Sequence, residues 1–198
     1  MGGRILVRAV GLALLITLAG AGGAVARGAE SSGRAFQGVA LLSGWSKGQL
    51  QNQDEYELVP VIVRFSYDLN VWLGRCDWRL PGEWRFNIEP FFGQSWSPAT
   101  DQEYGCGFFL RWQQPVWGRL GVYLEGGVGP IYMTLDSEEQ STSFNFIDQV
   151  GAGVMFEVND RLGAELGYRF RHVSNAGIKH PNGGIENDVV LLGLSYAY

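Results

Sequence analysis

The sequence predicts an all-β protein, namely an eight-stranded antiparallel transmembrane β-barrel with a filled polar interior. Three observations support this prediction. The chain begins with an export signal, it is rich in glycine and aromatic residues, and its apolar residues alternate with polar ones in eight runs. Alternation with a period of two is typical of strands whose two faces meet different surroundings.

The N-terminus has the parts of a secretory signal peptide, which we expect to occupy residues 1–26. Arg4 and Arg8 form a positively charged start, a short apolar segment follows, and residues 24–26 (Ala-Val-Ala) match a signal-peptidase site. The apolar segment soon breaks into glycine and alanine, so a permanent membrane anchor is disfavoured. Cleavage would leave residues 27–198 as the barrel domain.

Composition separates the chain from most soluble and helical membrane proteins. It contains 29 glycines and 13% aromatic residues, and its formal net charge is −5. The acidic balance makes nucleic acid a poor partner. After the signal segment no stretch approaches the roughly 18 apolar residues of a membrane-spanning helix. Glycine-rich and aromatic-rich sequence behind a signal peptide is instead typical of outer-membrane barrels.

Eight alternating runs follow one another at fairly even spacing. In each run one parity is mostly apolar or aromatic, and the other mixes charged residues, amides and glycine. An even number of strands fits an antiparallel barrel, and eight strands leave no room for a pore. The predicted strands are 34–45, 57–69, 83–96, 103–114, 120–133, 144–158, 164–174 and 188–198.

The polar parity is predicted to face the barrel interior. It carries arginine, glutamate, asparagine and glycine, whereas the exposed face of a soluble sandwich tends to carry lysine, threonine and serine. Charges inside a narrow barrel are tolerated when each finds a partner, and removing one partner is costly. The predicted members of this ion-pair network are Arg64, Arg85, Glu89, Arg111, Glu125, Glu157, Glu165, Arg169 and Arg171.

The connections between strands indicate how the barrel is oriented. Four polar connections follow the odd-numbered strands and are predicted to be extracellular, whereas the other three and both termini are predicted to be periplasmic. The extracellular set is 46–56, 97–102, 134–143 and 175–187, and the periplasmic set is 70–82, 115–119 and 159–163. The 70–82 connection is long for a periplasmic turn, which is the weak point of this topology.

The last strand ends in an aromatic residue. Tyr198 shares its parity with Tyr196, Leu194 and Leu192. This ending resembles the C-terminal signal by which outer-membrane barrels are handed to the barrel-assembly machinery, which we therefore expect as a partner.

The two cysteines, Cys76 and Cys106, are not expected to form a disulfide. The predicted topology places Cys76 in a periplasmic connection and Cys106 near the outer end of the fourth strand. Bonded cysteines need Cα atoms within about 7 Å, which opposite ends of a barrel do not provide.

A base, a nucleophile and an acid lie close together near the C-terminus. His172 and Ser174 continue the outward parity of Tyr168 in the seventh strand, and Glu186 precedes the eighth. Residues i and i+2 on a strand share a face, with Cα atoms about 6.5–7 Å apart. An imidazole and a hydroxyl can meet across that distance, and a carboxylate on the returning strand can orient the imidazole. The alternative is that these residues serve only as ordinary strand-end and turn residues.

The same segment resembles a known family. The run H-x-S-N-A-G at 172–177, followed by P-N-x-G-I-E at 181–186, is similar to the lipid A 3-O-deacylase family of outer-membrane acyl hydrolases. The resemblance implies an eight-stranded barrel that removes the 3-position acyl chain of lipid A and needs no metal or cofactor. The substrate would be lipid A, or lipopolysaccharide, in the outer leaflet of the outer membrane.

The resemblance also assigns roles to residues of this chain. Ser174 would be the nucleophile, His172 the general base and Glu186 the orienting acid. Asn175 and the backbone N–H of Gly177 would form an oxyanion hole, and Asn182 would shape the loop. The nearby Lys179 and His180 lie where an anionic headgroup could be met.

Other functions remain open at this point. A non-enzymatic small barrel for adhesion or envelope structure would keep the motif only as a turn, and a phospholipase or acyltransferase barrel would use the same groups on another lipid. Lipid A analysis of cells that express the wild type or Ser174→Ala would separate these three. The sequence also leaves a homodimer and the preferred acyl length open.

Overall fold

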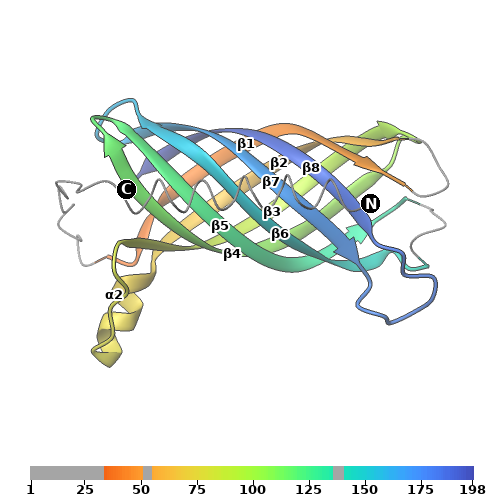
Figure 1. The fold of residues 1–198 in the computed structure, drawn as a ribbon, viewed down its shortest axis with the longest axis horizontal. Helices are drawn as coiled ribbons and strands as arrows, with labels where there is room; N and C mark the ends of the chain where they lie inside the picture. Colours follow the sequence, from red (N-terminus) through yellow and green to blue (C-terminus); the bar gives the residue numbers. More distant parts are fainter. Residues whose placement is uncertain (1–33, 51–54, 136–140) are drawn as a thin grey trace, which may run out of the picture.

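Eight antiparallel strands close into one barrel (Figure 1). The computed structural model describes residues 34–50, 55–135 and 141–198, so the predicted signal peptide lies outside the described residues. Each strand pairs with the next, and β8 pairs with β1 to close the sheet. The predicted fold class and number of strands are confirmed. The strands are β1 (Phe36–Gln49), β2 (Glu55–Asp68), β3 (Glu83–Ser97), β4 (Gln102–Trp117), β5 (Leu120–Met133), β6 (Phe144–Glu157), β7 (Leu162–Ser174) and β8 (Ile185–Ala197).

The strands β1 and β8 extend further into the predicted loops than their sequence pattern indicated. β1 continues to Gln49 and β8 begins at Ile185, because these two strands pair as far as Gln49 and Glu186. Polar residues in this region suggested loops, but pairing between neighbouring strands satisfies their backbone groups. Glu186 therefore lies within β8, whereas the sequence analysis placed it in the preceding loop. We call the end of the barrel near Glu186 the loop end. The opposite end, where β1 begins and β8 ends, is the turn end.

The long connection from β2 to β3 contains its own secondary structure. A short helix, α2 (Leu69–Leu73), and a 3-10 turn, η1 (Gly74–Cys76), project from the turn end (Figure 1). Asp68 caps α2 by accepting a hydrogen bond from Asn70 N–H at 2.9 Å. The Asn70 side chain also bonds Leu80 in both directions, which ties the two ends of the connection together. In the described ranges no helix is long and apolar enough to cross a membrane.

The two cysteines are both free thiols. Cys76 is exposed at the end of η1, and Cys106 lies in the half of β4 nearer the loop end. The two residues thus lie toward opposite ends of the barrel, as the predicted topology placed them.

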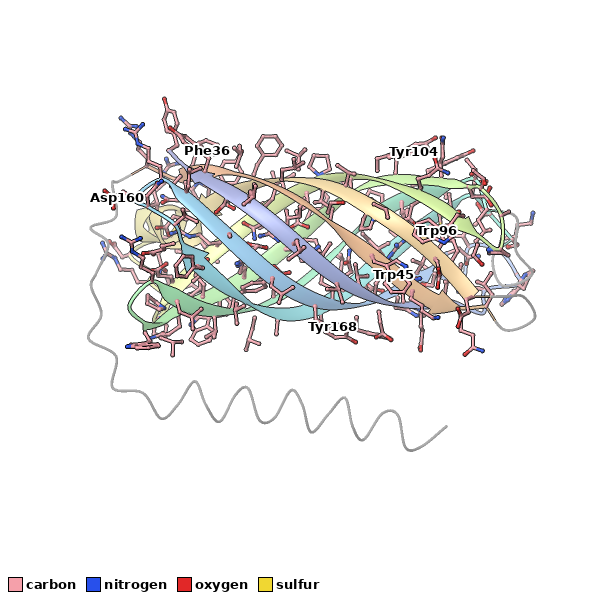
Figure 2. The ribbon with its side chains drawn as sticks, turned by 90° about the horizontal axis from the view of Figure 1, so that it is seen from above. Phe36, Trp45, Trp96, Tyr104, Asp160 and Tyr168 are labelled. Carbon is pink, nitrogen blue, oxygen red and sulfur yellow. The ribbon has the colours of Figure 1, made fainter. Side chains whose placement is uncertain are left out.

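The outer wall of the barrel is apolar in its middle and aromatic near both ends. Val63, Leu110 and Val150 are exposed on the outside, as their parity predicted. Figure 2 shows side chains standing away from the wall, with Trp45 and Trp96 toward the loop end. Such a band between aromatic girdles is the surface that a transmembrane barrel presents to lipid.

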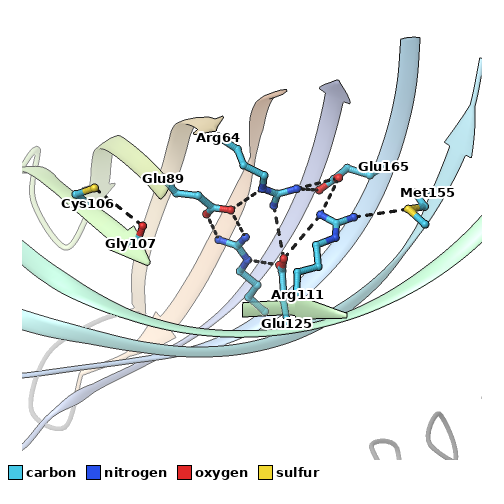
Figure 3. A network of polar contacts seen from close by, with 9 residues as sticks. Arg64, Glu89, Cys106, Gly107, Arg111, Glu125, Met155 and Glu165 are labelled. Atoms are coloured by element: carbon cyan, nitrogen blue, oxygen red, sulfur yellow. Dashed lines mark hydrogen bonds and ion pairs between the residues drawn. The ribbon is translucent and has the colours of Figure 1, made fainter. Parts of the chain in front are cut away.

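Most of the predicted interior charges form one buried network. Arg169 binds Glu89 at 2.8 Å and Glu125 at 2.7 Å, and Arg64 binds Glu89 at 2.6 Å. Glu165 joins the network by accepting from Arg64 at 2.8 Å and from Arg111 at 3.0 Å. Figure 3 shows these groups facing one another across the lumen. Each guanidinium has at least one carboxylate partner, and buried charges are tolerated in a barrel interior only when they are paired in this way.

Three predicted members, Arg171, Glu157 and Arg85, lie outside this network. Arg171 belongs to a separate pair, because both its terminal nitrogens bind Glu103 at 2.7 Å. The sequence analysis missed Glu103, which lies almost fully buried at the start of β4. Glu157 is exposed at the end of β6. Arg85 lies near the turn end, 3.7 Å from Asp68.

The interior is polar only in part. Toward the loop end it is filled by an apolar cluster, in which Val173 and Ile185 are almost fully buried. The other buried members of this cluster are Leu50, Tyr56, Leu58, Ile131, Met133, Leu135 and Ile147. The cluster lies directly behind the strand ends that carry the predicted catalytic residues.

Candidate active site

The predicted catalytic residues lie on the outer face of two neighbouring strands. His172 on β7 is the direct cross-strand partner of Glu186 on β8, and Ser174 follows His172 on the same face. His172 and Ser174 are half-buried, and Glu186 is exposed. Directly opposed residues of antiparallel strands have Cβ atoms about 4.5–5.5 Å apart. The structure therefore brings all three side chains together on the lipid-facing wall.

Buried neighbours hold the backbone of these residues in place. Val173 lies between His172 and Ser174 in sequence, and its side chain is 0% exposed on the inside of the barrel. Ile185, which precedes Glu186, is 1% exposed in the same apolar cluster. Because alternate side chains point to opposite faces, packing on the inside orients the predicted catalytic side chains on the outside.

A buried asparagine organises the loop that follows Ser174. Asn175 is 0% exposed, and its side-chain N–H groups donate to the carbonyl oxygens of Lys179 at 2.8 Å and Pro181 at 3.4 Å. Its side-chain oxygen accepts from Gly177 N–H at 3.0 Å. Its backbone N–H donates to Oδ1 of Asn182 at 2.9 Å. The loop is therefore attached to the strand end that carries Ser174.

These contacts bear on the predicted oxyanion hole. The side-chain donors of Asn175 and the N–H of Gly177 all bond within the loop, so neither points at an open position. Asn182 contacts the loop backbone, as a loop-shaping residue would. Among the described residues no hydrogen bond or ion pair joins His172 to Ser174 or Glu186. Catalytic hydrogen bonds often form only when substrate is bound.

Gly184 is a site residue that the sequence analysis missed. Its φ of +76° is a conformation that glycine adopts readily. A Cβ at this position would lie 2.6 Å from Cε1 of His172, so the imidazole packs directly against the bare backbone. The glycine of the P-N-x-G-I-E run was the available signal, but its contact with His172 requires the loop to fold back over β7.

Replacing Gly184 with alanine is expected to reduce kcat/KM about 10–100-fold, because the new methyl group displaces the imidazole. The matched control is Gly118→Ala, since Gly118 also has a positive φ but no heavy atom within 4 Å of an added Cβ. Both variants carry the strain of a left-handed residue, about 1–2 kcal/mol. Activity should fall only at position 184, measured on barrels whose folding is verified by heat-modifiable gel mobility. Equal losses in both variants would contradict a role for the His172 contact.

The outer loops also contain the cationic residues that the sequence analysis noted. Lys179 and His180 are exposed in the connection between β7 and β8. In the described ranges no group of three or more histidine, cysteine, aspartate or glutamate side chains is arranged to hold a metal ion.

The sequence is similar to known lipid A deacylases. Residues 61–195 match the family described as Lipid A 3-O-deacylase (PagL). Lipid A deacylase PagL of Bordetella bronchiseptica is 30% identical over 128 residues, which cover 59% of this chain and 66% of that protein. Lipid A deacylase PagL of Pseudomonas aeruginosa is 37% identical over 68 residues, which cover 33% of this chain and 37% of that protein. The chain thus spans just under two thirds of the first relative and about a third of the second.

Solved structures share the fold. The crystal structure of Neisserial surface protein A superposes with a TM-score of 0.61 at 13% identity, covering 82% of this chain and 97% of that one. The crystal structure of the outer membrane enzyme PagL superposes with a TM-score of 0.57 at 20% identity, covering 78% and 97%. At these identities the two structures support the barrel fold alone.

Proposed function

Because the chain belongs to the lipid A 3-O-deacylase family, we propose that it hydrolyses the 3-O-linked acyl ester of lipid A with Ser174, His172 and Glu186 as a catalytic triad. The protein is an outer-membrane β-barrel of a Gram-negative cell, as its family and its closed barrel indicate. In the proposal the loop end faces the cell exterior, where lipid A forms the outer leaflet.

One observation supports this substrate most directly: the three side chains lie on the outside of the barrel. The lumen behind them is filled by the apolar cluster and the ion-pair network, so a substrate has no space inside the barrel at the level of the triad. Apart from Asp188, the wall on the turn-end side of the triad is mainly apolar, with Val150 and Leu192 exposed. A lipid in the leaflet can therefore place its ester beside Ser174 and its acyl chains along the wall.

The proposed reaction has two steps. Ser174 Oγ attacks the ester carbonyl carbon while His172 takes the hydroxyl proton, and Glu186 stabilises the resulting imidazolium. The tetrahedral intermediate then expels the 3-oxygen of the glucosamine, which receives the proton from His172. In the second step His172 removes a proton from water, the hydroxide attacks the acyl-enzyme, and the free fatty acid leaves as Ser174 regains its proton.

The oxyanion of each tetrahedral intermediate needs hydrogen-bond donors. We assign this role to Gly177 N–H and the side-chain amide of Asn175, as the family resemblance implies. Both donors bond within the loop, so they would exchange those partners for the oxyanion as the substrate binds. Asn182 would hold the Asn175 backbone during this exchange. A lost oxyanion donor typically costs about 10²–10³ in rate.

The test is expression in a Gram-negative host whose own lipid A retains its 3-O-acyl chains, followed by mass spectrometry of its lipids. We expect lipid A to lose the mass of one hydroxyacyl chain and the matching free hydroxy fatty acid to appear. Unchanged lipid A with a folded barrel would favour a non-enzymatic envelope protein. Altered phospholipid beside intact lipid A would favour a phospholipase or acyltransferase. Crosslinking of the same membranes would test the homodimer and contact with the barrel-assembly machinery, both still predictions.

A further inference from the structure

His172 has a second carboxylate neighbour, on the strand opposite Glu186. Asp148 on β6 is the direct cross-strand partner of His172, just as Glu186 is on β8. Asp148 is exposed on the outer face of β6. The imidazole thus lies in the middle of a three-strand row, with one carboxylate on each side.

A carboxylate at the position of Asp148 destabilises the barrel unless it has a partner. Its outward neighbours on β6 are Phe146 and Val150, and a charge on a lipid-facing strand costs free energy that decreases toward the membrane interface. Asp188, another outward acid, accepts a hydrogen bond from Tyr168. Among the described residues no ion pair involves Asp148. Strand register places His172 directly opposite Asp148, and its imidazolium can supply the positive charge.

We propose that Asp148 is a second positioning carboxylate for His172, acting from β6 as Glu186 acts from β8; this inference rests on the proposed function. When Ser174 gives up its proton, the positive charge on the imidazole develops between the two acids. Glu186 and Asp148 face His172 from its two neighbouring strands, and Asp188 lies one outward position further along β8. Gly184 closes the loop side and carries no charge.

The test is a double-mutant cycle with Asp148→Asn and Glu186→Gln, scored by kcat and KM on purified barrels with lipid A in detergent micelles. Asp148→Asn alone is expected to lower kcat about 5–20-fold and leave KM within about twofold, since the carboxylate acts on charge formed during the reaction. Because each acid partly replaces the other, the double variant should lose more than the product of the two single losses. Asp148→Glu should recover most of kcat.

Asp188→Asn is the matched control, because it removes an outward carboxylate that is not opposite His172. It is expected to keep the wild-type kcat. Removing a charge from the lipid-facing wall does not threaten folding, and heat-modifiable mobility verifies each barrel. Three outcomes would overturn the proposal. Asp148→Asn could leave kcat unchanged both in the wild type and in Glu186→Gln, or it could change KM alone. The loss in the double variant could also equal the product of the two single losses. If the wild type itself leaves lipid A intact, the proposed function fails instead.

Discussion

Replacing Ser174 with alanine is expected to abolish lipid A deacylation, with a loss of at least about 10³-fold in kcat/KM. The substitution removes the oxygen that attacks the ester, and the neighbouring groups cannot supply another nucleophile in its place. Ser174 is half-buried on the outer face, so its loss leaves the packing of Val173 inside the barrel unchanged. Mass spectrometry of lipid A from cells that express the variant measures the effect.

A second serine provides the control for this result. Ser43 on β1 also lies on the outer face, but it pairs with Leu192, far along β8 from Glu186. Ser43→Ala is expected to keep wild-type activity. A fluorophosphonate probe should label the wild type and Ser43→Ala but not Ser174→Ala. Lipid A deacylation that persists in folded Ser174→Ala would show that another group is the nucleophile.

Replacing Arg169 with methionine is expected to lower the free energy of unfolding by about 3–5 kcal/mol, which is the usual cost of breaking a buried ion pair. Arg169 is 1% exposed and binds both Glu89 and Glu125. Its removal leaves those buried carboxylates with one positive charge too few to balance them. Urea unfolding of the barrel in lipid vesicles, followed by tryptophan fluorescence, measures the loss. The control Arg75→Met, at an exposed position in η1, should stay within about 0.5 kcal/mol of wild type.

The same network allows a rescue experiment. Combining Arg169→Met with Glu125→Gln leaves Arg64 and Arg111 to balance Glu89 and Glu165, so much of the lost stability should return. If Arg169→Met unfolds at the wild-type urea concentration, these ion pairs do not stabilise the barrel. If the double variant is no better than the single one, packing of the arginine side chain matters more than its charge.

Strand parity explains why so much of the fold could be predicted. Leu166, Tyr168 and Arg169 alternate in the sequence because lipid and lumen meet opposite faces of β7, and the structure places them accordingly. Parity also predicted that His172 and Ser174 face outward. These properties depend on successive residues of one strand, so they are visible without knowing which strand lies beside it.

Contacts between strands were harder to predict. The pairing of Arg171 with Glu103 joins β7 to β4, and the two residues are distant in sequence. Gly184 meets His172 only because a loop folds back, and Asp148 lies opposite His172 only through the register of β6. A register shift of two residues keeps every side chain on its own face, so the alternating pattern cannot select between such registers.

By itself, the sequence determined the barrel class, the outward side of the strand that carries His172 and Ser174, and the identity of the Ser-His-Glu candidates, because each depends on local parity and residue type. Only the tertiary structure decided that Glu186 belongs to β8, that Asn175 ties its loop together, and that a second acid lies beside His172. The physical reason is that closure of the barrel sets every register at once, and register decides which side chains meet.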